Sequence, residues 1–548
     1  MIRITNLCAP LDAAPDDVLA LALRKTQISP SAVVSWRLIK RSIDARDKAR
    51  VHFVHALDIE LFGDEAATVA RSPHRQISIE QPPVPLDFSI FQRPEPSSLP
   101  RPIVVGAGPA GLFAALALAE AGRRPIVLER GRSVRERQAD VRRFFATGEL
   151  DPESNVQFGE GGAGTFSDGK LNTGIKRDRL TQKVFDALVA AGAPREILWE
   201  AKPHIGTDRL AVVVENLRAE ICAKGGEFLF QHRFVGMELA GGALRAIEVI
   251  DHRKNALCRF DTRHLFLCVG HSARDTFEML LESGVTLTPK PFSIGVRIEH
   301  PQAMIDESQY GRRFAGHPAL GAADYKLAVH LPNGRSAYTF CMCPGGLVVA
   351  AASEQGGVVT NGMSELARDQ PNANAALLVG LTPADFGDAH PLAGVAFQRV
   401  FERAAFELGG AGFRAPAQTV GDFLKSRAST SISSLRSSYA PGVRPTDLTR
   451  CLPKFASDAL RQALPLLDKR LRGFAHPDAV MTGIETRSSS PVRIERDATT
   501  LQSVNVRGLF PCGEGAGYAG GITSSAADGL RAALAFLASI QPTHALPL

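Results

Sequence analysis

The first 80 residues alternate between apolar and polar positions in the manner of strands, with one helical stretch among them. The alternation in IRITNL, and further along in VVSWRLIKRSI and ARVHFVHALDIEL, predicts three strands. Pro15 and the two acidic residues after it open a helix through VLALALRKT, because carboxylates favour the positive end of a helix. We therefore expect a small α/β domain over residues 1–80.

A second pattern begins at residue 103, after a proline-rich stretch at 81–102 that predicts an extended linker. The segment IVVGAGPAGLFAALALAEAGRRPIVLER is typical of a strand, a tight glycine turn, an apolar helix and a second strand. Further on, we expect a helix at 181–192, and the Gly-Gly pair at 241–242 predicts a hairpin. Residues 103–290 are therefore expected to form the first part of a second domain.

Between residues 291 and 480 the expected strands become longer and more mixed, as in FSIGVRIEH, SAYTFCMC and GLVVAAAS. Helices are expected around 394–408 and 456–471. We interpret this stretch as an inserted domain. Over 481–548 the chain returns to a glycine-rich pattern, and GLFPCGEGAGYAGGITSSAADGLRAALAF predicts a strand, a loop and a helix.

The composition shows that the chain can bury large cores. Of its 548 residues, 45% are hydrophobic and 22% are charged, as in ordinary globular proteins. The net charge of +6 is small for this length, so it suits anionic ligands without indicating nucleic acid. The most basic stretch, at 37–50, is either a partner or RNA surface or, as we favour, a solvated strand face with a turn. We therefore do not expect a nucleic-acid partner.

Targeting signals and cysteine usage indicate the compartment. The start MIRITNLCAP lacks the basic and apolar regions of a signal peptide, and no uncharged apolar run reaches the roughly 18 residues that a membrane span needs. The eight cysteines are scattered without a C-x-x-C pair, as in proteins of a reducing compartment. We expect a cytoplasmic protein with no membrane partner.

The glycines at 106, 108 and 111 have the G-x-G-x-x-G spacing, which is weak evidence alone. Here the spacing follows an apolar strand and opens a long helix, and the next strand ends at Glu129, which completes the fingerprint of a dinucleotide site. Gly106 permits the tight turn, Gly108 lets the backbone approach a pyrophosphate, and Gly111 brings the helix close to the strand. The helix N-terminus then holds the anion, and Glu129 accepts hydrogen bonds from a ribose.

The glycine-rich loop near the C-terminus favours FAD over NAD. A second loop and helix at the far end of the chain suit the flavin half of FAD, with Glu514 placed for the ribityl chain or for a water on the pyrophosphate. The helix N-terminus at Gly521, Ile522 and Thr523 would face the flavin, where its positive end stabilises the anionic reduced form. We therefore expect non-covalently bound FAD.

Several long motifs resemble an uncharacterised bacterial family of FAD-dependent dehydrogenases, also described as NAD(P)/FAD-dependent oxidoreductases. The motifs are NVQFGEGGAGTFSDGKLNTG (155–174), KPHIGTD (202–208), VGHSARDTF (269–277), FSIGVRIEH (292–300), FCMCPGG (340–346), ETRSSSPVRI (485–494) and GEGAGYAGGI. More broadly, the GAGPAG start and the GEGAGYAGGI end resemble the single-Rossmann FAD-binding superfamily that includes p-hydroxybenzoate hydroxylase and glutathione reductase.

The resemblance runs through nearly the whole chain and implies an α/β fold. An FAD-binding Rossmann-like domain, formed by 103–290 and 481–548, would be interrupted by a mixed-sheet substrate domain at 291–480. The small N-terminal α/β domain and the linker would precede it.

The resemblance also implies further cofactor residues. Arg130 and Arg137 stand where such families place a basic group near the phosphates, and Gly270 ends the strand beneath the ADP half. The loop at 159–170 would line the flavin, and the acidic loop at Gly513 carries Glu where Asp is more usual. The expected cofactor residues are Gly106, Gly108, Pro109, Ala110, Gly111, Glu129, Arg130, Arg137, Gly161, Gly162, Gly164, Thr165, Gly270, Gly513, Glu514, Gly521, Ile522 and Thr523.

Three residues are candidates for the chemistry. Asp168 and Lys170, in the flavin loop, would contact the substrate or the flavin N5. Arg487 is either a cation near the flavin pyrimidine or an anionic substrate, or a loop arginine paired with Glu485 or Glu495.

Cysteines and histidines offer weaker candidates. Cys341 and Cys343 form a C-x-C pair whose side chains would share one face of a strand, and we interpret them as packed thiols rather than as a thiolate near the flavin. His271 is interpreted as a capping or ADP-side residue rather than a general base. The 14 histidines show no H-x-x-x-H spacing, so we expect no metal site.

Together these features predict a two-electron oxidoreductase, a dehydrogenase or reductase that acts on a small molecule through FAD. NAD(P)H fits as an electron donor, and it would dock transiently because there is no second G-x-G-x-x-G. A flavin monooxygenase, or a non-catalytic or RNA-associated FAD-binding protein, remains an alternative. The sequence defines neither the substrate nor the oligomeric state.

Overall fold

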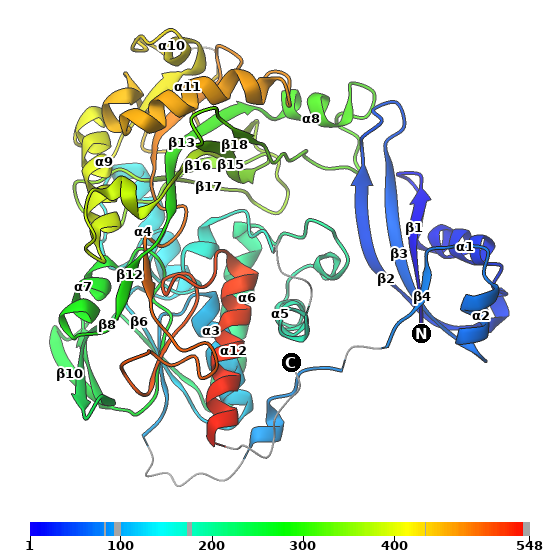
Figure 1. Ribbon diagram of the computed structural model, residues 1–548, viewed down its shortest axis with the longest axis horizontal. Coiled ribbons are helices and arrows are strands. Elements are labelled where there is room, and N and C mark those ends of the chain that lie inside the picture. The colour runs from blue at the N-terminus through cyan, green and yellow to red at the C-terminus, as the bar shows by residue number, and fades with distance from the viewer. Residues whose placement is uncertain (82–83, 93–99, 172–177, 433–434, 541–548) are drawn as a thin grey trace.

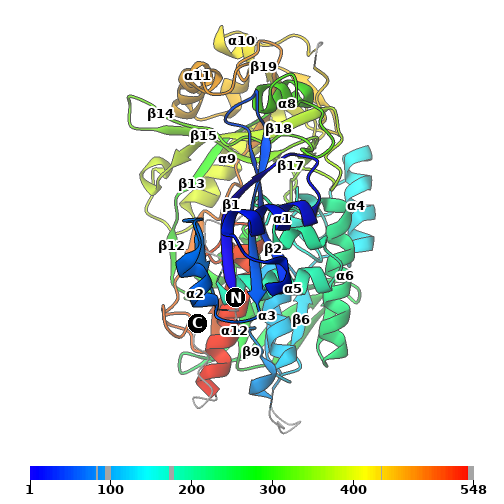
Figure 2. The same cartoon turned by 90° about the vertical axis from the view of Figure 1, so that its right-hand side faces the viewer.

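The computed structural model describes residues 1–81, 84–92, 100–171, 178–432 and 435–540. A small N-terminal unit lies beside a main body of two units (Figure 1), and Figure 2 views the molecule from the side of the N-terminal unit. The predicted linker at 81–102 lies partly outside the described residues. Within the described part, Ser89–Phe91 forms a short 3₁₀ turn.

The N-terminal unit is an antiparallel sheet with two helices. Its elements are β1 (Ile2–Ala9), α1 (Pro15–Thr26), β2 (Val33–Asp44), β3 (His52–Leu61), α2 (Glu65–Arg71) and β4 (Ile77–Ile79). The sheet order β2-β3-β1-β4 is that of two split βαβ pairs. The three predicted strands and the helix that begins at Pro15 are confirmed.

The basic stretch at 37–50 contacts the main body. The N–H of Arg41 donates to the C=O of Trp199 at 2.7 Å, and the N–H of Ala201 donates to the C=O of Arg41 at 2.9 Å. The guanidinium of Arg41 donates to Glu200 at 2.6 Å, and Lys48 contacts the C=O of Ser308. Part of this stretch therefore connects the N-terminal unit to the main body, although the side chain of Arg41 is still 36% exposed and residues 46–50 face solvent.

A parallel sheet forms the core of the second unit. Its order is β23 (Leu509–Pro511), β11 (Leu265–Leu267), β5 (Ile103–Val105), β6 (Ile126–Glu129) and β7 (Glu227–Phe230), and neighbouring strands pair in parallel. Successive residues face opposite cores: Val104 lies in one apolar cluster, and Ile103 and Val105 lie in another. Both faces of the sheet are therefore covered, as is usual for parallel strands.

Helices cover one face of this sheet and an antiparallel layer covers the other. The helices are α3 (Pro109–Glu120), α5 (Arg179–Ala190), α6 (Thr207–Ala223) and α12 (Ile522–Ile540), and α12 packs along α3 (Figure 1). The opposite layer has β8 (His232–Ala240), β9 (Ala243–Asp251), β10 (Ala256–Asp261) and α7 (Arg274–Glu282), and α4 (Val134–Thr147) lies near α6. The hairpin predicted at 241–242 joins β8 to β9.

The inserted unit is built on a mixed sheet. Its strands are β13 (Phe292–Pro301), β14 (Ala328–His330), β15 (Ser336–Cys343), β18 (Asn372–Leu381), β19 (Ala415–Thr419), β20 (Val443–Pro445) and β21 (Val480–Glu485), in the order β14-β15-β18-β13-β21-β19-β20. A separate pair is β16 (Leu347–Ala350) and β17 (Thr360–Met363), and the helices are α8 (Gln302–Tyr310), α9 (Ala393–Gly409), α10 (Val420–Leu424) and α11 (Lys454–Asp468). Only β19 and β20 pair in parallel among these described strands.

The α/β class, with a parallel Rossmann-like sheet and a mixed sheet, is therefore confirmed, and the helices expected around 394–408 and 456–471 are present. The boundary predicted at 480 differs from the structure, since β21 belongs to the inserted sheet up to Glu485. The chain enters and leaves the insertion side by side, because β12 (Leu287–Pro289) pairs with β22 (Val492–Ile494).

Among the described residues, no helix combines the length and the apolar character that crossing a bilayer requires. Within the same part of the chain, no three or more His, Cys, Asp and Glu side chains are grouped so that they could hold a metal ion.

We predict that Gly529→Ala lowers the melting temperature. A Cβ at Gly529 in α12 would lie 2.1 Å from the backbone oxygen of Ala110 in α3, so the two helices would have to separate. At an unobstructed helix position, replacing Gly by Ala stabilises the folded state by about 0.5–1 kcal/mol. A lowered melting temperature would therefore show that the close helix contact outweighs this gain. Thermal unfolding followed by circular dichroism measures it.

Gly412→Ala is the matched control, because nothing lies within 4 Å of the position that its Cβ would take. An unchanged or raised melting temperature for Gly529→Ala would contradict the close contact between α3 and α12.

Candidate functional site

One cavity of about 660 Å³ is lined by residues of both the parallel-sheet unit and the insertion. It lies at the carboxyl ends of β5, β6 and β11, where open α/β sheets bind their ligands. The predicted site residues that line it are Gly106, Gly108, Pro109, Ala110, Glu129, Arg130, Gly162, Gly164, Asp168, Lys170, Gly270, Arg487, Glu514, Gly521 and Ile522. The structure thus brings together segments from opposite ends of the main body.

The turn between β5 and α3 is shaped for a close approach of backbone to ligand. Gly106 has a φ of +98°, and a Cβ there would lie 2.3 Å from the backbone oxygen of Cys268. A Cβ at Gly111 would lie 1.8 Å from the oxygen of Gly106, so only glycine allows this contact. Gly108 is the N-cap of α3 and offers no capping side chain, which leaves the first backbone N–H groups for an anion.

Glu129 ends β6 and lines the same cavity. Its carboxylate accepts hydrogen bonds from the N–H groups of Ala107 at 2.8 Å, Gly131 at 3.0 Å and Gly159 at 2.9 Å. A carboxylate has about four acceptor positions, so three backbone donors fix it and leave capacity for a hydroxyl donor. This arrangement fits a ribose acceptor.

Arg130 lines the cavity with its charge already balanced. Its guanidinium donates to Glu153 at 2.8 Å and to Asp275 at 2.9 Å, and it lies 4.1 Å from the centre of the Phe158 ring. Burial alone would lower the pKa of Arg130, but the two carboxylates raise it above its ordinary value. Arg130 therefore offers a stacked, paired cation and not a free one.

Arg137 is fully buried and does not line the cavity. Its guanidinium donates to five backbone carbonyls, those of Asn155, Val156, Gly159, Glu160 and Gly162. The predicted phosphate contact is therefore corrected: all three guanidinium nitrogens donate to the 155–162 loop, and the side chain does not reach the cavity. Burial lowers the pKa of Arg137 to about 10, so the side chain stays charged at neutral pH.

Other predicted residues lie behind the cavity surface and do not line it themselves. Thr523 donates to the C=O of Leu171 at 3.1 Å, and the backbone at Gly161 lies so close to Thr165 that a Cβ there would be 2.0 Å from the hydroxyl. The N–H of Gly513 donates to Asp528 at 2.8 Å. These residues, with Gly111, shape the cavity without forming its surface.

Glu514 occupies the acidic position of the C-terminal loop. Burial raises the pKa of Glu514 to about 7, although a hydrogen bond from the backbone of Gly521 and the charge of Lys290 act in the opposite direction. Near neutral pH the Glu514 side chain therefore exists both as a carboxylate, which accepts hydrogen bonds, and as a carboxylic acid, which can donate one.

Asp168 and Lys170 line the cavity as an ion pair. Their charged atoms lie 3.0 Å apart, and Arg368 donates to Asp168 at 2.9 Å. Burial alone would raise the pKa of Asp168, but Lys170 and Arg368 bring it below its ordinary value. Asp168 is therefore a carboxylate at neutral pH, which suits positioning better than proton abstraction.

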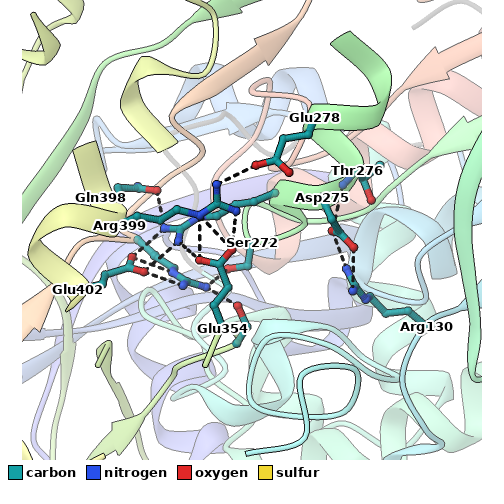
Figure 3. Close-up of polar contacts among 12 residues, drawn as sticks. Arg130, Ser272, Asp275, Thr276, Glu278, Glu354, Gln398, Arg399 and Glu402 are labelled. Atoms are coloured by element: carbon teal, nitrogen blue, oxygen red, sulfur yellow. Dashed lines mark hydrogen bonds and ion pairs between the residues drawn. The ribbon is translucent and has the colours of Figure 1, made fainter. Parts of the chain in front are cut away.

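Arg487 belongs to a buried charge network that joins the two main units. Figure 3 shows its acceptor Glu402 close to Ser272 and Gln398. It donates to Glu402 of α9 at 2.9 and 3.1 Å and to Ser272 and Ser353 at 3.1 and 2.6 Å. Glu402 also accepts from Arg274 at 2.7 Å. Burial would raise the pKa of Glu402, yet the two arginines hold it far below its ordinary value.

This network corrects the partners expected for Arg487. Neither Glu485 nor Glu495 pairs with it. Glu485 instead pairs with the buried Arg297 at 3.2 Å. Arg487 lines the cavity, but its charge is compensated by Glu402 before any ligand binds.

His271 lies in the same wall, and its Nδ1 is 3.0 Å from the hydroxyl of Ser272. Burial, together with Arg487 and Arg274, lowers the pKa of His271 to about 3. The ring is therefore neutral at physiological pH and too weakly basic to favour the role of a general base, whereas its expected capping or ADP-side role stays a prediction.

The sequence patterns did not identify Arg297 and Glu402 as residues that matter at the site. Each carried a signal, because each is a charged residue at a buried position of an apolar element, Arg297 in β13 and Glu402 on the buried face of α9. A charge is placed there only when a partner compensates it.

Comparisons with known proteins agree with this geometry. Residues 291–488 match the family described as FAD-dependent protein, C-terminal domain-like, residues 101–151 match an FAD binding domain, and residues 1–60 match a domain of unknown function. The chain is 46% identical over 536 residues to an uncharacterised protein of Clostridium beijerinckii, which covers 97% of this chain and 98% of that protein.

Solved structures show weaker similarity. A geranylgeranyl bacteriochlorophyll reductase-like protein of Thermoplasma acidophilum has 11% identity and a TM-score of 0.37, over 81% of this chain and 79% of that one. Quinol fumarate reductase of E. coli has 12% identity and a TM-score of 0.37, over 82% and 72%. A flavin-dependent monooxygenase solved with FAD and substrate has 16% identity and a TM-score of 0.27, over 53% of this chain and 44% of that one. At these scores the similarities carry no functional weight.

We predict that Glu402→Gln destabilises the protein by about 3–5 kcal/mol, because it leaves Arg487 buried without a paired carboxylate and Arg274 with only the partly exposed Glu354. The folded-state pKa of Glu402 lies below that of an unfolded glutamate. The Glu402 carboxylate therefore stabilises the fold at pH values above the pKa of an unfolded glutamate. This stabilisation is lost as the pH falls toward the lower pKa that Glu402 has in the folded protein. The difference from wild type should hold from about pH 8 to about pH 5 and shrink only in stronger acid. Thermal unfolding across this range measures it.

Glu278→Gln is the matched control, since Glu278 pairs with Arg399 at 2.7 Å but its side chain is 41% exposed. We expect at most about 1 kcal/mol there. Equal effects of the two substitutions would contradict a buried network that joins the units.

Proposed function

The chain belongs to a family of FAD-binding proteins that includes the Clostridium beijerinckii relative, and from this premise we propose that it is an FAD-dependent oxidoreductase. The observation that supports this most strongly is one cavity whose wall combines the Gly106–Gly108 turn, Glu129, and the C-terminal loop at Glu514 and Gly521. FAD would be held without a covalent bond.

The residues present fit FAD. The cavity volume of about 660 Å³ lies within the usual range of ligand sites, roughly 300–1,000 Å³. The α3 N-terminus would hold the pyrophosphate, Glu129 a ribose, and the segment from Glu514 to Ile522 the flavin end. When bound, FAD supplies two-electron chemistry, and the protein supplies binding, orientation and electrostatics.

The remaining wall defines where a small-molecule substrate would enter. Residues of the insertion reach the cavity from β15, from the end of β21 and from the segment before β14, including Tyr325, Lys326 and Thr339. Lys170 and Asp168 face them from the parallel-sheet unit. We therefore place the substrate between the two units, with the Asp168–Lys170 pair as its positioning residues.

The favoured activity is that of a dehydrogenase or reductase, with NAD(P)H or the substrate as electron donor. The low pKa of Asp168 and the paired state of Arg487 leave positioning and electrostatics, and not acid–base chemistry, as the contributions of these residues. A monooxygenase and a non-catalytic FAD-binding protein are the alternatives that experiment separates.

We predict that purified protein releases FAD, and not FMN, on heating, and that Gly108→Val weakens FAD binding by at least about tenfold while the chain still folds. A Cβ at Gly108 would meet only the Cα of Gly162, at 3.7 Å, so the added side chain would occupy ligand space without disturbing the protein. Flavin identity is read by chromatography, and affinity by fluorescence titration of the apoprotein.

Gly380→Val on β18 is the control, because nothing lies within 4 Å of its Cβ position and it does not line the cavity. Full FAD occupancy in Gly108→Val, or recovery of FMN alone from wild type, would contradict the proposed site.

Stopped-flow mixing with NADH and NADPH, followed by oxygen, separates the activities. A dehydrogenase or reductase predicts fast reduction of the flavin by the donor and slow reoxidation by oxygen. A transient absorbance on mixing with oxygen would favour the monooxygenase. Inertness toward both donors and toward candidate substrates, with FAD bound, would favour the non-catalytic alternative.

A further inference from the structure

The C-x-C pair lies where β15 departs from regular pairing. β15 pairs with β18 through Phe340 and Ala376 and then through Cys343 and Asn374, so one extra residue is accommodated between them. Cys341 has a φ of +41°, which is unusual for a side chain other than glycine. The expected sharing of one strand face by the two thiols is therefore corrected: Cys341 is partly exposed and lines the cavity, whereas Cys343 is fully buried.

Two cations act on this pair. The buried Arg297 donates to the C=O of Cys341 at 2.9 Å and to the sulfur of Cys343 at 3.6 Å. Lys170, which lines the same cavity, adds a second positive charge.

The two thiols are thereby made unequal. A hydrogen bond from Cys343, with the charges of Arg297 and Lys170, outweighs burial and the charge of Glu485 and lowers the pKa of Cys341 below its ordinary value. The same hydrogen bond and burial raise the pKa of Cys343. At neutral pH the partly exposed Cys341 is therefore more readily deprotonated than the buried Cys343. Cys451 shows the contrast, because burial and the charge of Asp447 raise its pKa to about 12 and outweigh a backbone hydrogen bond and the charge of Arg450, which act in the opposite direction.

We propose that Cys341 is a site of oxidation by hydroperoxides, with Cys343 as the resolving thiol. An accessible thiolate with a second cysteine beside it is the arrangement of peroxide-sensitive thiols. The Cys341 sulfur attacks the terminal oxygen of the hydroperoxide, the O–O bond breaks, and the leaving oxygen takes a proton from solvent. Cys341 becomes a sulfenic acid, having given up two electrons.

The second step resolves this acid. The Cys343 sulfur attacks the Cys341 sulfur, an S–S bond forms, and the S–O bond breaks. The hydroxyl leaves as water with the Cys343 proton. The pair thus reduces one hydroperoxide to an alcohol or water and ends as a disulfide. A thiol reductant returns it to the reduced state by exchange.

A source of peroxide follows from the proposed function, because reduced flavins that meet oxygen release hydrogen peroxide. That source rests on the proposed FAD site, whereas the reactivity of the thiols depends only on the chain itself. Peroxide formed in the cavity would be released into the same space that Cys341 lines.

The test is oxidation of the purified protein by added hydrogen peroxide, with FAD bound and with FAD removed, followed by peptide mass spectrometry. We expect Cys341 to be oxidised at least about tenfold faster than the exposed Cys8 and Cys222, because far more of it is thiolate at neutral pH. Wild type should yield the Cys341–Cys343 disulfide. Cys343→Ala should accumulate a sulfenic acid on Cys341 that dimedone traps.

The oxidation rate of Cys341 should reach its plateau at a lower pH than that of an ordinary thiol, which rises near about pH 8.5. Cys451→Ala is the control and should match wild type. Oxidation of Cys341 no faster than that of Cys8, or no dimedone adduct in Cys343→Ala, overturns the proposal whether or not FAD is bound. If added peroxide oxidises the pair but reduction of the flavin in air does not, the thiol site stands and the flavin source fails.

Discussion

The contact between α3 and the turn that precedes it is the constraint on which the rest of the site depends. Gly111 lies against the backbone oxygen of Gly106, so α3 begins directly above the end of β5. This places the α3 N-terminus and the end of β6, with Glu129, on one wall of the cavity. Because α12 packs along α3, the N-terminus of α12 opens onto the same space. Two helix N-termini thus face one cavity, a favourable environment for an anionic cofactor.

The buried charges fix the opposite wall. Arg274 and Arg487 would be costly in an apolar interface, and Glu402 from the insertion compensates both. The insertion is therefore held to the parallel-sheet unit by buried ion pairs, with Glu354 as a second partner of Arg274. One consequence is that Arg487 is not the free cation that its place beside the cavity suggested. Lys170 is likewise paired, with Asp168, so the electrostatic influence on a bound flavin would fall mainly to the helix N-termini.

Local patterns predicted the elements and the dinucleotide fingerprint because both depend on short spacings. The glycine turn, the strand that ends at Glu129 and the helix beginning at 522 are each defined within a few residues of their signals. The roles of Arg137 and Arg487 were not predictable in this way. Arg137 binds carbonyls of a loop with no periodic pattern, and the partner of Arg487 lies 85 residues away on a helix of another unit. The bulge at Cys341 likewise breaks the alternation from which a shared strand face was inferred.

The central claim is that the segments near 106–111, 159–170 and 513–523 line one site for a single FAD molecule. Hydrogen–deuterium exchange of the apoprotein and of the protein reconstituted with FAD tests this most directly. The account predicts that FAD slows exchange in all three segments, and that ADP slows exchange only in the first. Protection by FAD confined to 106–111 and the end of β6, with the C-terminal loop unchanged, would contradict it.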